Sequence, residues 1–211
     1  MAQILAFGDS ITDGAFDIEG GWASRLQRFF MAENTKKDPP KGEHFFYNLG
    51  ISGNTTDDLL ERIEVEAKAR KVARPDKKSV FIFAIGTNDG SIQEGSDETR
   101  VPLKKFQDNL NQLITFAKKY TDKILIVGLL PVVEEYTQPE YTNERVRQFD
   151  ETLKRVAEDS GAAFLELFKK MQQVPKWEQL FDDGLHPTTE GHAWMFQQVQ
   201  PKLVELLVEG V

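Results

Sequence analysis

The sequence contains no cysteine, and this absence is the first constraint on its chemistry. Disulfide bonds, thiolate metal ligands and a cysteine nucleophile are all excluded. Histidine is also scarce, with 3 residues in a chain of 211. A metal centre that requires several imidazole ligands is therefore poorly supported.

Two further absences concern membranes and nucleic acids. No stretch approaches the ~18 consecutive apolar residues that indicate a membrane span, and the N-terminal "MAQILAFGDS" lacks the basic segment and long apolar run of a signal peptide. We therefore expect a cytoplasmic protein. Acidic residues outnumber basic ones by 34 to 26, and the formal net charge of -8 argues against binding to DNA or RNA. A small, uncharged or weakly charged partner fits this composition better.

A single domain spanning residues 1–211 is expected from the length and composition. Hydrophobic residues make up 40% of the chain, which is enough for one well-buried core. No stretch rich in proline, glycine and serine, and no block of charge, marks a boundary between domains.

Short apolar runs alternate along the chain with amphipathic stretches. The runs predict five buried strands, at residues 3–7, 44–50, 79–86, 123–131 and 162–167. Apolar residues at helical spacing predict intervening helices around residues 22–30, 59–63, 103–117, 146–157 and 188–208. Thr55 and Thr56 are expected to cap the second helix, Pro102 is expected at the first position of the third, and Pro201 is expected to break or kink the last.

Strands that alternate with helices predict right-handed crossovers and a parallel sheet covered on both faces. The expected fold is a three-layer α/β/α domain. In such a sheet, ligands bind outside the carboxyl ends of the strands. Polar and glycine-rich clusters follow four of the predicted strands: "GDSITDG", "LGISGNTTDD", "GTNDGS" and, after an intervening loop, "FDDGLHPTTEGH". All four clusters are therefore expected at one edge.

This edge would hold the groups that nucleophilic catalysis needs. Ser10 is a candidate nucleophile, but a serine hydroxyl is weak without an adjacent base. His186 is the candidate base, and Asp183 lies three residues before it, close enough for its carboxylate to support the imidazole. A tetrahedral intermediate also needs hydrogen-bond donors for its oxyanion, which the amides of Ser10 and Gly53 and the side chain of Asn88 could supply.

Four blocks of sequence in this order resemble the SGNH hydrolases, also called GDSL-type esterases and lipases. The blocks are "FGDSIT", with Ile11 where the family name has leucine, then "NLGISGNTT", "GTND" and "DGLHP". The resemblance implies a flavodoxin-like sheet of order 2-1-3-4-5 and ester hydrolysis through an acyl-serine intermediate. It also implies Ser10, Asp183 and His186 as catalytic residues, but leaves open a Ser10–His186 pair in which a backbone carbonyl partly orients the imidazole in place of Asp183. It further implies Ser10, Gly53 and Asn88 as oxyanion donors, and no metal or organic cofactor.

Several residues near these blocks have more than one interpretation. Supporting hydrogen bonds within the turns are expected from Asp9, Asp13, Thr87 and Asp89, although Asp13 and Asp89 could instead bind a metal ion. Trp22 fits core packing or a wall of the acyl pocket. His192 is expected on the outer part of the last helix.

Substrate identity depends on two variable loops, residues 89–102 and 132–145. The second contains Tyr136 and Tyr141, which could frame a sugar or a short acyl group or could lie in solvent. Neither loop has the apolar content of a lid over long-chain lipid, which favours short acyl esters, such as acetyl esters of sugars. A metal-dependent phosphoesterase and a non-catalytic carbohydrate-binding or interaction module are the alternatives. The sequence does not indicate an oligomeric state.

Overall fold

The computed structural model describes residues 2–36, 43–71, 78–93 and 95–208. These residues form a five-stranded parallel sheet in the order β2-β1-β3-β4-β5. The strands are β1 (Ala2–Gly8), β2 (His44–Gly50), β3 (Lys78–Ala84), β4 (Ile124–Val127) and β5 (Ala163–Leu165). The expected fold class and strand order are confirmed. Within the described residues, no helix is long and apolar enough to cross a membrane.

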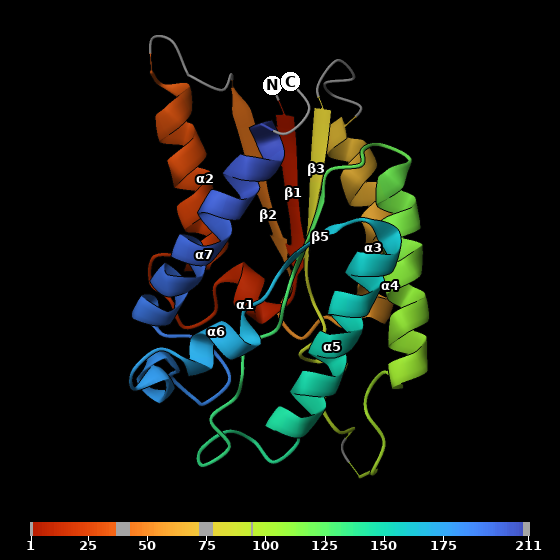
Figure 1. Cartoon of the computed structure of the whole chain (residues 1–211), viewed down its shortest axis with the longest axis vertical. Coiled ribbons are helices and arrows are strands. Elements are labelled where there is room, and N and C mark those ends of the chain that lie inside the picture. Colours follow the sequence, from red (N-terminus) through yellow and green to blue (C-terminus); the bar gives the residue numbers. More distant parts are fainter. Residues whose placement is uncertain (1, 37–42, 72–77, 94, 209–211) are drawn as a thin grey trace.

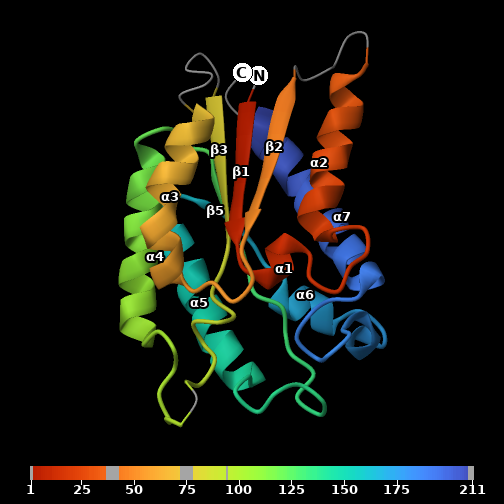
Figure 2. The same ribbon diagram turned by 180° about the vertical axis from the view of Figure 1, so that it is seen from behind.

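Helices cover both faces of the sheet (Figures 1 and 2). One face is covered by α2 (Gly21–Asn34) and α7 (Thr189–Val208). The other is covered by α3 (Thr56–Lys71), α4 (Leu103–Lys118) and α5 (Asn143–Ser160). The short elements are α1 (Ser10–Asp13), α6 (Phe168–Gln172) and a 3-10 helix, η1 (Trp177–Leu180).

The central strand β1 shows why the strands are continuous apolar runs. Successive side chains of a strand point to opposite faces. Leu5 and Phe7 accordingly join the core beneath α3, α4 and α5, whereas Ile4 and Ala6 join the core beneath α2 and α7. Because both faces are buried, an alternation of apolar and polar residues would place polar groups in one of the cores.

The strand register aligns the loops that carry the polar clusters. Gly8 at the end of β1 pairs with Gly50 of β2 on one side and with Ala84 of β3 on the other. The first three clusters follow these residues directly, so they emerge side by side at the lower edge of the sheet in Figure 1. A side chain at Gly50 would collide with the backbone of Asp13, because a Cβ there would lie 2.2 Å from the Asp13 nitrogen.

Some element boundaries differ from those expected. The predicted strand at 123–131 is shorter, because the Leu129 N–H donates to the Asp150 carboxylate on α5 (2.8 Å) and leaves the ladder. The predicted strand at 162–167 is likewise shortened to β5. Pro102 was expected at the first position of α4 but is its N-cap, with an extended ψ of 140°, so the helix begins one residue later, at Leu103.

The last helix continues through Pro201 instead of breaking there. Pro201 is exposed, so its ring projects to solvent while the buried residues Met195, Val199 and Leu203 keep α7 on the sheet. Tertiary packing of this apolar face outweighs the loss of one backbone hydrogen bond.

Candidate active site

The turn after β1 holds Ser10 at the start of α1. Asp9 is the N-cap, and its carboxylate accepts a hydrogen bond from the Ile11 N–H at 3.0 Å. The helix ends after one turn because Gly14 takes a left-handed conformation, with φ of 100°. Ser10 is consequently almost buried, with its hydroxyl at the edge of the sheet where the other polar clusters gather.

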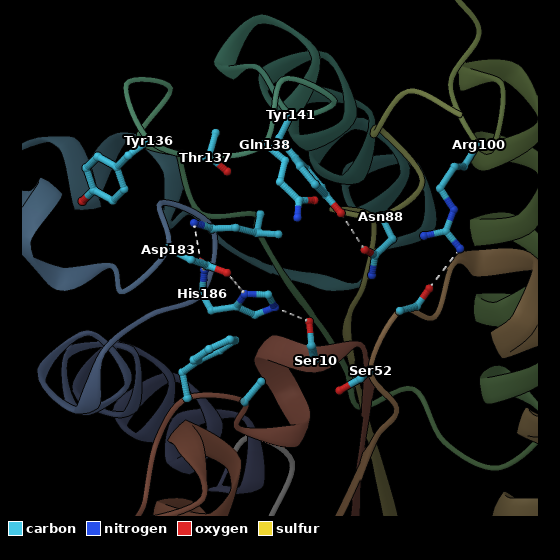
Figure 3. A pocket seen from close by; sticks show the side chains of 14 residues that line it. Ser10, Ser52, Asn88, Arg100, Tyr136, Thr137, Gln138, Tyr141, Asp183 and His186 are labelled. Carbon is cyan, nitrogen blue, oxygen red and sulfur yellow. Dashed lines mark hydrogen bonds and ion pairs between the residues drawn. The ribbon is translucent and has the colours of Figure 1, made fainter. Parts of the chain in front are cut away.

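Three side chains from the two ends of the chain form one hydrogen-bonded series (Figure 3). The Ser10 Oγ lies 2.9 Å from His186 Nε2, and His186 Nδ1 lies 2.8 Å from Asp183 Oδ2. A carboxylate accepts hydrogen bonds only, so the proton of the neutral imidazole lies on Nδ1 and the Nε2 lone pair faces the serine hydroxyl. This tautomer is the one that a general base for Ser10 requires.

A tight turn fixes the short spacing between Asp183 and His186. The Asp183 carboxylate accepts from the backbone N–H groups of Leu185 (3.0 Å) and His186 (2.7 Å). Gly184 supplies the positive φ of 81°, in a position where a Cβ would lie 2.8 Å from the Val133 oxygen. Although partial burial acts to raise the pKa of Asp183, these hydrogen bonds and the one from the imidazole lower it below its ordinary value.

Asn88 lies on the opposite side of Ser10 from His186 (Figure 3). Within the described residues, the backbone N–H groups of Ser10 and Gly53 donate no hydrogen bond. Asn88 donates from Nδ2 to the Asn54 oxygen at 3.0 Å, and its Oδ1 accepts from the Tyr141 hydroxyl at 3.2 Å. These two bonds fix the orientation of the amide and leave one Nδ2–H unpaired in the described part of the chain.

These groups line a pocket of about 620 Å³. Ser10, Gly53, Asn88, Asp183 and His186 all contribute to its wall, so the structure brings the five sequence-predicted residues together. Loops following β3 and β4 also contribute to the wall, with Arg100 on one and Tyr136, Thr137, Gln138 and Tyr141 on the other. Position 94 of the first loop lies outside the described residues.

Comparison with known proteins assigns the chain to a family. Residues 6–194 match the sequence model of the GDSL-like lipase/acylhydrolase family. The chain belongs to this family. A GDSL esterase/lipase of Arabidopsis thaliana is 28% identical over 224 residues, covering 99% of this chain and 87% of the relative. The isoamyl acetate-hydrolyzing esterase of Saccharomyces cerevisiae is 28% identical over 221 residues, covering 96% of this chain and 86% of the relative.

Solved structures show the same fold. A lipase/acylhydrolase from Enterococcus faecalis superimposes with a TM-score of 0.78 at 22% identity and covers 98% of this chain and 96% of its own. Membership in the GDSL-like family identifies the protein as a carboxylic ester hydrolase.

Two of the expected supporting residues in this GDSL-family site are buried carboxyl groups. Burial raises the pKa of Asp9 to about 7, against the opposing hydrogen bond from Ile11 and with a contribution from the neighbouring Asp89. Asp89 accepts from the N–H and hydroxyl of Thr56, the first residue of α3, and burial raises its pKa to about 6 despite these bonds. Both residues therefore brace the turns beneath the pocket.

The other two expected supporting residues differ in burial. Thr87 is buried and lines a small cavity beside Asp9. Asp13 is exposed and accepts a hydrogen bond from the Ser52 hydroxyl at 3.4 Å, which connects the first two loops. Among the described residues, no group of three or more histidine, aspartate or glutamate side chains is arranged to hold a metal ion.

The expectation for His192 was wrong. Its ring is fully buried between α7 and the loop that precedes α2, where Nδ1 accepts from the Trp22 N–H and Nε2–H donates to the Ala15 oxygen, both at 3.3 Å. Burial lowers its pKa to about 4. Trp22 is a core residue with no exposed surface and does not line the pocket.

Sequence reasoning also missed Phe16, whose ring packs against the pocket histidine. The two ring centroids lie 4.9 Å apart with the planes tilted by 37°, and Phe16 is 61% exposed. Its positive φ of 63° is unusual for an aromatic residue and presents the ring at the pocket wall. No sequence signal marks a left-handed phenylalanine, so this contact could be found only in the structure.

Proposed function

We propose that the protein hydrolyses short-chain carboxylic esters through an acyl-serine intermediate on Ser10. The observation that carries this proposal is the pair of hydrogen bonds that connects Ser10 Oγ to His186 Nε2 and His186 Nδ1 to Asp183. Such a series activates a hydroxyl that is otherwise a poor nucleophile.

The reaction follows from the positions of these atoms. Ser10 Oγ attacks the ester carbonyl carbon while His186 Nε2 takes its proton, and Asp183 stabilises the imidazolium that forms. The carbonyl oxygen becomes an oxyanion that accepts from the N–H groups of Ser10 and Gly53 and from Asn88 Nδ2. The imidazolium then protonates the leaving alcohol, and a water molecule activated by the same imidazole releases the acid.

Short acyl groups are proposed on two grounds. Polar side chains, including Ser52, Thr137 and Gln138, contribute much of the pocket wall, which suits a small polar substrate better than a long hydrocarbon chain. The yeast relative is named for hydrolysis of isoamyl acetate, an ester of a two-carbon acid.

The test compares p-nitrophenyl esters of increasing acyl length in the presence of a chelator. Ser10→Ala should lower kcat by at least about 10⁴-fold, because it removes the nucleophile. Asn88→Ala should lower kcat by about 10²–10³-fold, because it removes one oxyanion donor. Ser52→Ala is the matched control, since Ser52 lines the same pocket but forms no hydrogen bond with His186. Equal activity of Ser10→Ala and wild type, or activity abolished by the chelator, would overturn the proposal.

A further inference from the structure

The pocket wall contains one positive charge that has no acidic partner among the residues the structure describes. Its charged residues are Asp183, which is bonded to His186, and Arg100. Within the described residues, Arg100 forms no salt bridge, and its side chain has one hydrogen bond, from Nη2 to the Gly53 oxygen at 3.1 Å. Arg100 is exposed, and its remaining guanidinium donors have no partner in the described part of the chain, in a protein whose formal net charge is -8.

The backbone of Arg100 is held in a fixed place. Its N–H donates to the Ser91 oxygen at 2.9 Å, and an antiparallel bridge joins Ile92 to Thr99 just before it. The following N–H, that of Val101, donates to the Asp89 oxygen at 3.2 Å. A side chain anchored at both its backbone and its tip loses less conformational entropy when it binds a ligand.

The direction of the guanidinium sets which part of a substrate it could meet. Arg100 lies beyond Asn88 from His186, and one of its terminal nitrogens is directed toward Asn88 (Figure 3). The leaving alcohol must lie next to His186, because the imidazole protonates it. The oxyanion lies next to Asn88 and Gly53, so the acyl group takes the direction that remains, into the pocket whose wall includes Arg100.

We propose that Arg100 forms a subsite for a carboxylate on the acyl group, so that the preferred substrates are monoesters of short dicarboxylic acids. This inference rests on the esterase function proposed above. A guanidinium binds a carboxylate through charge-assisted hydrogen bonds with a matching planar geometry. An apolar acyl chain in the same place would displace water from Arg100 without replacing its hydrogen bonds, so the residue also disfavours long hydrocarbon chains.

The test measures ethanol release from monoethyl succinate, glutarate and adipate, each paired with the ethyl ester whose far carboxyl is a primary amide. The two members of a pair have the same shape and differ in charge. The wild type should prefer the carboxylate member by about tenfold in kcat/KM at one or more chain lengths, and this preference should weaken at high salt. Arg100→Gln should reduce the preference to about one.

Lys104→Gln is the matched control for loss of one positive charge. Lys104 lies four residues further along the chain, pairs with Asp108 on α4 and does not line the pocket, so the preference should survive this change. If Arg100→Gln lowered kcat/KM equally for the carboxylate and the amide ester of a pair, Arg100 would serve only to position the Gly53 backbone, and the subsite would be overturned. A wild type without any preference would also overturn the subsite.

Failure of the esterase proposal can be recognised separately. If no ethanol is released from either member by wild type, the proposed chemistry fails, and the subsite is then tested by calorimetric titration of monoethyl succinate, glutarate and adipate. Ser10→Ala should bind one of these probes, and the double variant with Arg100→Gln should bind it about tenfold more weakly. Equal binding by the two variants would overturn the subsite.

Discussion

At the scale of single residues, Asn88 belongs to a short sequence motif, but the orientation of its side-chain amide depends on a residue far along the chain. A primary amide has a donor end and an acceptor end, and only the donor end can stabilise an oxyanion. Tyr141 donates to the acceptor end from the loop after β4, and burial raises the pKa of its hydroxyl above the ordinary value. "GTND" indicates Asn88 from sequence, whereas no pattern in the variable loop indicates that Tyr141 reaches it.

Tyr141→Phe should therefore lower kcat by about tenfold, because Asn88 loses the bond that orients its amide. KM should change little, since the ground-state ester does not use this donor fully. The measurement is steady-state hydrolysis of p-nitrophenyl acetate.

Tyr136→Phe is the control for this prediction. Tyr136 lines the same pocket from the same loop but donates to the Glu178 oxygen and does not contact Asn88. If both substitutions altered kcat equally, or if Tyr141→Phe raised only KM, the hydroxyl of Tyr141 would be a substrate contact and not a positioning group.

At the scale of elements, the spacing of apolar residues predicts the helices, but it predicts less well which of their residues are buried. The apolar residues of α7 indicate a helix from sequence, and a histidine among them was expected to lie outside. It is instead buried, because α2 and the preceding loop leave a backbone N–H at Trp22 and a carbonyl at Ala15 that only a donor and acceptor such as imidazole can satisfy together.

His192→Ala should lower the free energy of unfolding by about 1–3 kcal/mol, because it leaves two backbone groups unpaired and opens a cavity. Urea denaturation at pH 8 measures the change. Gln197→Ala is the control, since Gln197 is exposed on the same helix and should alter stability by less than about 0.5 kcal/mol. A fully stable His192→Ala protein would contradict the bridging role of the imidazole.

At the scale of the whole molecule, the parallel sheet could be predicted because alternating strands and helices permit few topologies, and the sheet edge then brings the four motifs together. Packing of the helices on this sheet also buries several ionisable side chains, and the sequence alone does not show which ones are buried. Burial raises the pKa of three carboxyl groups, to about 7 for Asp9, 6 for Asp89 and 7 for Asp150, and lowers that of His192 to about 4.

These shifts predict a protein that is more stable at pH 5 than at pH 8. A carboxyl group whose pKa is raised in the folded state contributes stability below its unfolded pKa and loses it as pH rises through the folded value. His192 has the opposite effect, because its contribution is lost as pH falls from 6.5 toward 4. The stability that the three carboxyl groups lose between pH 5 and pH 8 exceeds the stability that His192 gains over the same range. The urea concentration at the midpoint of unfolding should therefore fall as pH rises from 5 to 8.

Asp150→Asn isolates one of the three carboxyl groups. Asparagine keeps an oxygen that can accept from the Leu129 N–H, but its side chain cannot ionise. The free energy of unfolding of Asp150→Asn relative to that of the wild type should therefore be higher at pH 8 than at pH 5. The difference between the two pH values should be about 2 kcal/mol. Asp159→Asn, on the exposed face of the same helix, should give the same change at both pH values. A pH-independent effect of Asp150→Asn would mean that this carboxyl group does not carry its raised pKa in the folded protein.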